Sequence, residues 1–231
     1  MMGKTVGVIG GMGPAATVHF MSRMLALTPA RLDQDHVRLI VDNNGAIPDR
    51  NAAIRGTGPS PGPVLAEMAR GLERAGAELL VMPCNTAHAF AADVRGASSL
   101  PFIDLIETAC DEAMAGRPSR VGVLAADGCL EAWLYQDALA RRGVQAITCR
   151  PDAQTRFMAL LYRIKAGDIG EEVRAGARTL AEGLIEAGAE IIVAGCTEVP
   201  LALGAGDLAI PLVDSVDALA RATITAARST S

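Results

Sequence analysis

The sequence predicts an α/β protein made of two similar halves, each built on a parallel sheet. The composition favours this class, because half of the 231 residues are hydrophobic, only 3% are aromatic and 24 are glycine. Short apolar runs alternate with helix-like stretches along the chain. Three segments also return in the same order at nearly constant spacing: VGVIGGMG at 6–13 as VGVLAADG at 121–128, GAELLVMPCNTAH at 76–88 as GAEIIVAGCTEVP at 188–200, and LPFIDLIETA at 100–109 as IPLVDSVDAL at 210–219.

The elements follow one pattern in both halves. A short Val/Ile-rich run ends in a Gly-containing turn and a helical stretch follows, which is typical of parallel strands joined by helical crossovers. We expect strands near 4–10, 37–42, 78–83, 100–103, 120–125, 145–149, 190–195 and 209–213. We expect helices over 14–27, 61–76, 86–96, 104–116, 130–142, 152–165, 168–188 and 214–228. The Gly- and Pro-rich segment 47–63 is predicted to be a loop over the carboxyl edge of the sheet, where α/β proteins bind ligands.

Charge and cysteine usage argue against several classes of protein. The net charge of −5 and the absence of any Lys/Arg cluster disfavour a nucleic-acid or anionic-membrane surface. No apolar run reaches the roughly 18 residues of a spanning helix, and the N-terminal MMGKTVGVIGG enters a strand without a signal-peptide pattern. Five cysteines without C-x-x-C spacing favour a reducing cytoplasm, with neither a disulfide framework nor a bound metal.

The repeated segments place a cysteine at the same point of each half. Cys84 and Cys196 each follow an apolar strand and precede a threonine-bearing turn. If the halves face each other across a pseudo-twofold axis, the equivalent strand ends meet in one cleft. The two thiols would then approach one ligand from opposite sides.

Two opposed thiols suit the inversion of a stereocentre by proton transfer. One thiolate removes the α-proton while the other thiol delivers a proton to the opposite face. A thiol pKa near 8.5 can be tuned for both roles by the amides of a following helix, and Asn85, Thr86 and Thr197 could bind a carboxylate there. The remaining three cysteines are interpreted as small buried hydrophobes: Cys110, Cys129 and Cys149.

The turn GGMGPAA at 10–16 has two interpretations. Gly11, Gly13 and Ala16 match the dinucleotide fingerprint G-x-G-x-x-A, and Asp42 could then hold a ribose. The duplicate turn lacks these glycines, which favours a turn that lets the backbone approach a small ligand instead. Met12 and Gly13 of this turn are therefore candidate substrate-binding residues.

The settings of His88 and of the two lysines disfavour a Cys–His pair, a metal pair and a pyridoxal phosphate site. His88 lies four residues after Cys84, but the second half has Pro200 at that place, so helix packing is favoured over a Cys–His pair or a metal pair. Neither Lys4, which opens a strand, nor Lys165, which ends a helix, has the setting of a pyridoxal site. We therefore expect α-proton abstraction without a cofactor.

Five motifs together resemble the cofactor-independent aspartate/glutamate racemase family, and most closely its aspartate racemase branch. They are GGMGP at 10–14, IPDR at 47–50, PCNTAH at 83–88, IKAG at 164–167 and GCTEVP at 195–200. The resemblance implies two Rossmann-like α/β domains with the active site between them, and a homodimer. It also implies that the first domain takes back the C-terminal helix, so the domains would be 1–98 plus 207–231, and 99–206.

The resemblance further implies roles for individual residues. Cys84 and Cys196 match the acid/base pair of the family. Asn85, Thr86 and Thr197 match residues that bind the α-carboxylate. Arg50 and Lys165 match residues that hold the side-chain carboxylate in aspartate racemases.

The chain departs from the glutamate racemase branch at two places. That branch has an Asp-Ser-Gly turn where this chain has GGMGP, and a His where this chain has Glu198. Glu198 is therefore counted with the substrate-binding residues, and aspartate is favoured over glutamate, which stays a further candidate. Two alternatives remain open: a maleate-type cis–trans isomerase, and a nucleotide or small-ligand binding protein.

Overall fold

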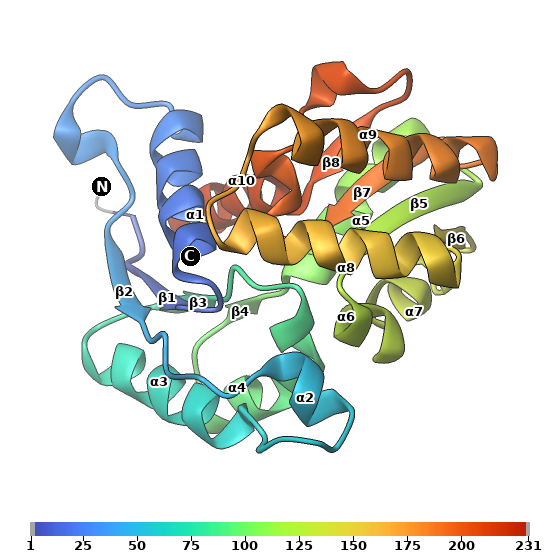
Figure 1. Ribbon diagram of the computed structural model, residues 1–231. Helices are drawn as coiled ribbons and strands as arrows, with labels where there is room; N and C mark the ends of the chain where they lie inside the picture. The colour runs from blue at the N-terminus through green and yellow to red at the C-terminus, as the bar shows by residue number, and fades with distance from the viewer. Residues whose placement is uncertain (1–2, 230–231) are drawn as a thin grey trace.

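The computed structural model describes residues 3–229, and its first half is built on a four-stranded parallel sheet (Figure 1). The strands lie in the order β2-β1-β3-β4, with the bounds β1 Val6–Gly10, β2 Leu39–Asn43, β3 Leu79–Val81 and β4 Phe102–Ile103. β1 lies in the middle, because Val6 pairs with Leu39 on one side and with Leu79 on the other. The predicted strands of this half are confirmed.

The second half repeats the same sheet. Its strands lie in the order β6-β5-β7-β8, with the bounds β5 Arg120–Ala125, β6 Gln145–Thr148, β7 Ile191–Gly195 and β8 Leu212–Asp214. Val121 pairs with Ala146 on one side and with Ile191 on the other, as Val6 does between its own neighbours. This equivalence confirms the predicted duplication of one α/β unit.

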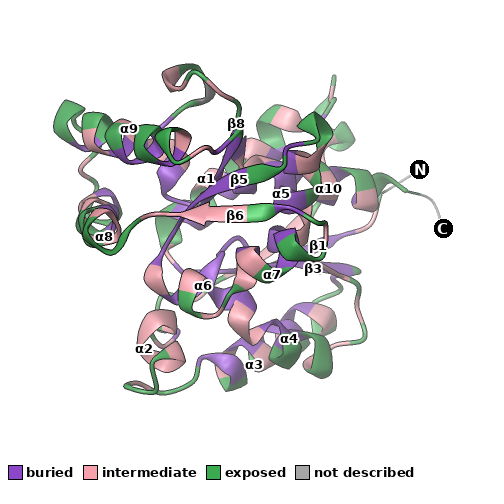
Figure 2. Ribbon diagram, turned by 90° about the vertical axis from the view of Figure 1, so that its right-hand side faces the viewer, coloured by how far each residue is buried: buried purple, intermediate pink, exposed green. Residues whose placement is uncertain are grey.

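Helices cover both faces of each sheet (Figures 1 and 2). A shared apolar core joins the two sheets through a central layer of helices: α1 Pro14–Leu27, α5 Leu105–Ala113, α7 Leu134–Ala140 and α10 Ser215–Arg228. The other face of the first sheet is covered by α3 Gly62–Arg74 and α4 Ala91–Ala97. The other face of the second sheet is covered by α8 Pro151–Lys165 and α9 Glu171–Glu186.

Sequence periodicity and capping explain these helices. In α3 the residues at 65, 68, 69 and 72 are apolar and buried, which is the spacing of one helix face. α5 and α10 begin with the same cap, because the carboxylates of Asp104 and Asp214 each accept the second and third backbone N–H of the helix that follows. The repeated Asp therefore sets the start of both helices.

The last helix of each half crosses toward the other sheet. α5 follows β4 of the first sheet but packs against β7 and β8 of the second, while α10 follows β8 and reaches α1, β3 and β4. The predicted domain bounds, 1–98 plus 207–231 and 99–206, stay a prediction. The strand pairing divides the chain differently, since 102–103 belongs to the first sheet and 212–214 to the second.

Three predicted elements differ from the structure. The predicted helix over 86–96 begins as a 3₁₀ helix over Thr86–Phe90 and continues as α4. The segment 47–63 is not entirely a loop, because Arg50–Ile54 forms the short helix α2, which begins where the Asp49 carboxylate accepts a 2.7 Å hydrogen bond from the Ala52 N–H. The predicted helix over 130–142 is divided into α6 (Asp127–Glu131) and α7, because Trp133 between them has a positive φ of 55°.

The glycine turn after β1 has a packing reason. A Cβ on Gly10 would lie 2.6 Å from the Thr17 side chain, and one on Gly11, at a φ of 99°, would lie 2.2 Å from the Asn44 carbonyl oxygen. These glycines let β1, α1 and the end of β2 approach closely. Of the fingerprint residues, Gly11 therefore has a packing role of its own.

Candidate active site

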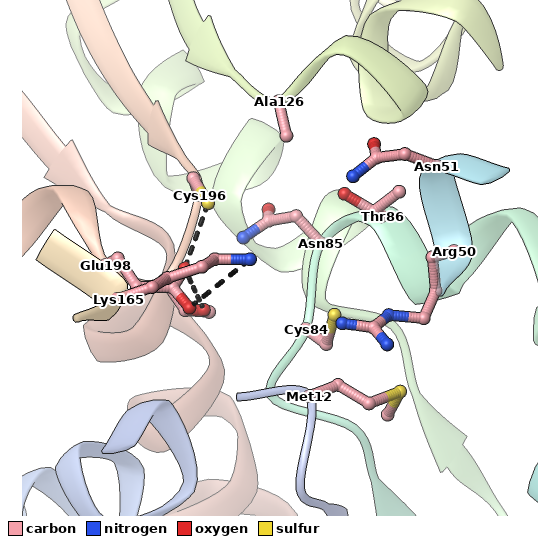
Figure 3. A pocket seen from close by; sticks show the side chains of 11 residues that line it. Met12, Arg50, Asn51, Cys84, Asn85, Thr86, Ala126, Lys165, Cys196 and Glu198 are labelled. Atoms are coloured by element: carbon pink, nitrogen blue, oxygen red, sulfur yellow. Dashed lines mark hydrogen bonds and ion pairs between the residues drawn. The ribbon is translucent and has the colours of Figure 1, made fainter. Parts of the chain in front are cut away.

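A pocket opens at the carboxyl ends of the strands, where the two halves meet (Figure 3). Cys84 lies three residues beyond β3, and Cys196 directly follows β7, so equivalent strand ends deliver the two thiols. Both side chains line the pocket, and each cysteine is only 6% exposed. The structure thus brings together two residues that are 112 positions apart.

The pocket contains nearly all of the predicted site residues. Its lining consists of Met12, Arg50, Asn51, Cys84, Asn85, Thr86, Ala126, Lys165, Cys196, Thr197 and Glu198. Gly13 is adjacent, because a Cβ on it would lie 3.7 Å from Oε1 of Glu198. Sequence reasoning missed Asn51 and Ala126. Ala126 corresponds to Gly11 in the repeat, so the duplication could have indicated it, whereas no comparable signal marks Asn51.

Cys84 is buried, and Arg50 is the charged residue with the largest influence on it. Burial raises the pKa of the Cys84 thiol above its ordinary value, while the Arg50 guanidinium and the Ala87 backbone N–H act in the opposite direction. Thr86–Phe90, which follows, is a 3₁₀ helix. The predicted stabilisation by backbone amides is therefore present here but does not outweigh desolvation.

Cys196 lies beside a carboxylate instead. Its Sγ donates a hydrogen bond to Oε2 of Glu198 over 3.0 Å, and the Thr197 hydroxyl donates to the same oxygen over 3.2 Å. Burial, and next the negative charge of Glu198, raise the pKa of the Cys196 thiol well above its ordinary value. Both features keep this thiol protonated.

His88 contacts the backbone of Cys84 rather than its thiol. The Leu105 N–H donates to Nε2 of His88 over 3.0 Å, so the proton lies on Nδ1, which donates to the Cys84 carbonyl oxygen over 2.8 Å. Burial lowers the pKa of His88, so the ring stays neutral. His88 therefore joins the Cys84 segment to the start of α5, in line with the packing role favoured from the sequence.

A buried hydrogen-bond chain orients Asn85. The Tyr135 hydroxyl donates to Oδ1 of Asn85 over 2.6 Å, and Nδ2 of Asn85 donates to the Ser215 hydroxyl over 3.3 Å. Ser215 in turn donates to the Ala194 carbonyl oxygen over 2.7 Å. Tyr135 belongs to α7 and Ser215 to α10, so side chains of the second half hold this amide of the first. The sequence gives no sign of this long-range contact.

The pocket contains two cations and one carboxylate. Lys165 Nζ lies 3.9 Å from Oε1 of Glu198, and although burial acts to lower the pKa of Lys165, the negative charge of this carboxylate is the main cause that keeps the pKa above its ordinary value. Arg50 donates through Nη1 to the Pro48 carbonyl oxygen over 3.1 Å, and its buried Nε has no hydrogen-bond partner among residues 3–229. The site is therefore suited to an anionic ligand.

Residues 3–229 contain neither a cluster of metal-ligating side chains nor a helix that could span a membrane. In that range no group of three or more His, Cys, Asp or Glu side chains is arranged to hold a metal ion. Of the helices described there, none combines the length and the hydropathy required to cross a membrane. The pocket between Cys84 and Cys196 is thus the place where the sequence motifs converge.

Comparison with known proteins places this pocket in a family context. The pattern of the Asp/Glu/hydantoin racemase family matches residues 9–223. The broad specificity amino-acid racemase RacX of Bacillus subtilis is 26% identical over 224 residues, which cover 95% of this chain and 96% of that protein. A glutamate racemase of Deinococcus radiodurans is 35% identical over 159 residues, 66% of this chain and 54% of that protein.

Solved structures agree with these matches. The aspartate racemase of Picrophilus torridus superposes with a TM-score of 0.84 at 29% identity, covering 97% of this chain and 94% of that one. A glutamate racemase of Francisella tularensis in complex with D-glutamate superposes with a TM-score of 0.67 at 18% identity, covering 97% and 81%. The second similarity concerns the fold alone.

Proposed function

This chain belongs to the Asp/Glu/hydantoin racemase family and is an amino-acid racemase, and we propose that it interconverts L- and D-aspartate by proton transfer between Cys84 and Cys196. The observation that carries the proposal is the pair of buried thiols at equivalent strand ends of the two sheets, facing one pocket. Such a pair supplies one acid/base group for each face of Cα. No cofactor is required by this chemistry.

In the proposed reaction one proton leaves Cα and one proton is returned to it in each turnover. With Cys84 as the thiolate, its sulfur takes the α-proton and the electron pair of the C–H bond is delocalised into the α-carboxylate. The Cys196 thiol then gives its proton to the opposite face, leaving Cys196 as the thiolate. The reverse reaction exchanges the two roles. Asn85, Thr86 and Thr197 are the proposed donors to the α-carboxylate, where charge develops.

Aspartate is favoured because of the charges in the pocket. Arg50 and Lys165 provide two cations against the single carboxylate of Glu198, and a dicarboxylic amino acid has a net charge of −1. The buried Nε of Arg50, which has no partner, could donate to the distal carboxylate. The similarity to the Picrophilus torridus aspartate racemase supports aspartate, and the similarity to the Deinococcus radiodurans glutamate racemase keeps glutamate as a further substrate.

A substrate panel in deuterated water tests this proposal. Each L- and D-amino acid is incubated with the enzyme and followed by NMR for loss of the α-proton signal, with maleate included for the isomerase alternative. We expect exchange and inversion to be fastest with aspartate. Fast exchange with another amino acid and none with aspartate would contradict the assignment of aspartate as the substrate. Consumption of maleate without any α-proton exchange would contradict the two-thiol proton transfer.

We also propose that the protein forms a homodimer and is located in the cytoplasm. The first proposal follows from the resemblance to the racemase family, and the second from the cysteine usage of the sequence. Light scattering coupled to size-exclusion chromatography tests the first, with 23.9 kDa expected for one chain. Fractionation of the source cells tests the second.

A further inference from the structure

The pocket wall formed by α2 is held by the other half of the molecule. Arg50 and Asn51, at the start of α2, both line the pocket, and α2 lies beside α6 of the second half (Figures 1 and 3). α6 begins directly after Ala126, which also lines the pocket. The α2–α6 contact therefore joins the two halves in one wall of the pocket.

Four side chains make this contact, together with one backbone N–H. Arg55, just after α2, donates through Nη2 to Oδ2 of Asp127 over 2.7 Å and through Nε to Oε1 of Glu131 over 3.0 Å. Oδ1 of Asn51 accepts a hydrogen bond from the Gly128 N–H over 2.9 Å. We call this set of contacts the α2–α6 clasp. Its acceptor Asp127 is itself fixed by Gln154, whose Nε2 donates to Oδ1 over 2.8 Å.

The α2–α6 clasp supplies the long-range hydrogen bonds of the segment 47–61. The other hydrogen bonds described for residues 47–61 are local, such as those from Ala52 to Asp49 and from Arg50 to Pro48. The halves also approach closely here, since a Cβ on Gly128 would lie 2.6 Å from Oδ1 of Asn51. Loss of the clasp would therefore leave the turn that presents Arg50 without a polar tie to the second half.

We propose that Arg55 is a positioning residue, which holds α2 against α6 at the edge of the pocket by binding Asp127 and Glu131 and so keeps Arg50 and Asn51 at the substrate. The inference deepens the proposed racemase function, because it assigns the control of substrate binding to residues outside the pocket lining. Arg55 contacts no reacting atom. Its effect is on the population of the closed pocket, and this population sets the apparent affinity for substrate.

The test compares Arg55→Gln with Arg221→Gln. Arg221 is the control because it also donates two hydrogen bonds to one carboxylate, that of Glu112. The side chains of Arg221 and Glu112 are 45% and 34% exposed, and those of Arg55 and Glu131 are 44% and 42% exposed. Neither Arg221 nor Glu112 lines the pocket. For Arg55→Gln we expect KM for aspartate to rise about fivefold, with kcat nearly unchanged and with recovery in Arg55→Lys. Arg221→Gln should keep the wild-type KM. Equal KM values for the two Gln variants would overturn the proposal.

A second readout does not depend on the substrate. Because Cys84 and Cys196 are buried in the pocket, loss of the clasp should speed their alkylation by iodoacetamide, as measured by peptide mass mapping. We expect a severalfold higher rate in Arg55→Gln and in Gly128→Ala, and the wild-type rate in Arg221→Gln. Salt should raise the wild-type rate toward that of Arg55→Gln, since exposed ion pairs are screened. Unchanged labelling would refute the clasp even if aspartate proved not to be the substrate.

Discussion

The two cysteine segments have the same backbone setting and different electrostatic surroundings. Cys84 has the Arg50 guanidinium as its main charged neighbour, whereas Cys196 donates a hydrogen bond to the Glu198 carboxylate. Burial raises the pKa of both thiols, but a cation opposes this shift at Cys84 and an anion adds to it at Cys196. Duplication thus supplied two equivalent positions, and the neighbouring side chains made them unequal.

This difference has a mechanistic consequence under the proposed function. A racemase needs one thiolate and one thiol at the start of each turnover. The pKa of both thiols is raised by burial, but Cys84 loses its proton the more readily of the two, because the Arg50 guanidinium opposes the shift there whereas the Glu198 carboxylate adds to it at Cys196. We therefore infer that the resting enzyme reacts more readily with the enantiomer whose α-proton faces Cys84.

Removal of either pocket thiol should have the largest effect. We expect Cys84→Ala and Cys196→Ala each to lower the rate of L-to-D conversion by about 10³-fold or more, because one face of Cα loses its acid/base group. Polarimetry or chiral chromatography measures the conversion, and Cys149→Ala, outside the pocket, is the matched control. Retention of more than a few per cent of the activity in either pocket variant would contradict the two-thiol mechanism.

Removal of either cation should have the next largest effect. Arg50→Ala and Lys165→Ala should each cost about 2–4 kcal/mol in kcat/KM for aspartate, by analogy with the truncation of one partner of a buried charge pair. The loss should be far smaller for alanine, which lacks a distal carboxylate. Steady-state kinetics with both amino acids checks this, and equal losses would show that the two cations support the pocket generally.

Glu198→Gln should reduce the difference between the two thiols. Because the carboxylate contributes to the raised pKa of Cys196, its neutralisation should lower that pKa, and Cys196 should then be alkylated at lower pH. Cys84, for which Glu198 is a weaker contributor, should respond less. The pH dependence of iodoacetamide labelling at each cysteine gives both curves. An equal displacement of the two curves would argue against a specific Cys196–Glu198 contact.

A core cysteine outside the pocket should show the smallest effect, on stability alone. Burial raises the pKa of Cys110 to about 12, from an ordinary value of 9.0. Above pH 9 the unfolded thiol ionises while the folded one stays protonated, so the free energy of unfolding should fall by up to about 1.4 kcal/mol per pH unit for this group.

Urea unfolding between pH 8 and pH 10 measures that slope. In Cys110→Ala the slope should be shallower, whatever the overall stability of the variant. An unchanged slope would mean that Cys110 does not titrate differently in the two states.

Much of the fold could be predicted from local signals. The eight apolar runs became strands, because a buried parallel strand needs only a short Val/Ile-rich stretch bounded by turn residues. Helix bounds were less accurate where the signal was weak. The Asp49 cap of α2 was hidden among Gly and Pro residues, and the break at Trp133 has no breaker residue to announce it.

The site, like the fold, could be predicted where the sequence carries a local or repeated signal, and not elsewhere. The repeat of Cys84 as Cys196 was enough to predict one pocket, because equivalent strand ends of duplicated halves converge at their junction. Tyr135, Asn51 and Arg55 could not be found in this way. Their partners are 50 to 77 residues away along the chain, and such contacts have no local pattern.

The sequence by itself determined the α/β class, the two halves and the paired cysteines, because these depend on local patterning and on internal repetition. Only the tertiary structure decided how the two thiols differ, since burial and the proximity of Arg50 or Glu198 arise when the halves pack together. It also decided the α2–α6 clasp. Hydrogen bonds and ion pairs between distant segments depend on the three-dimensional arrangement, and no stretch of sequence specifies them alone.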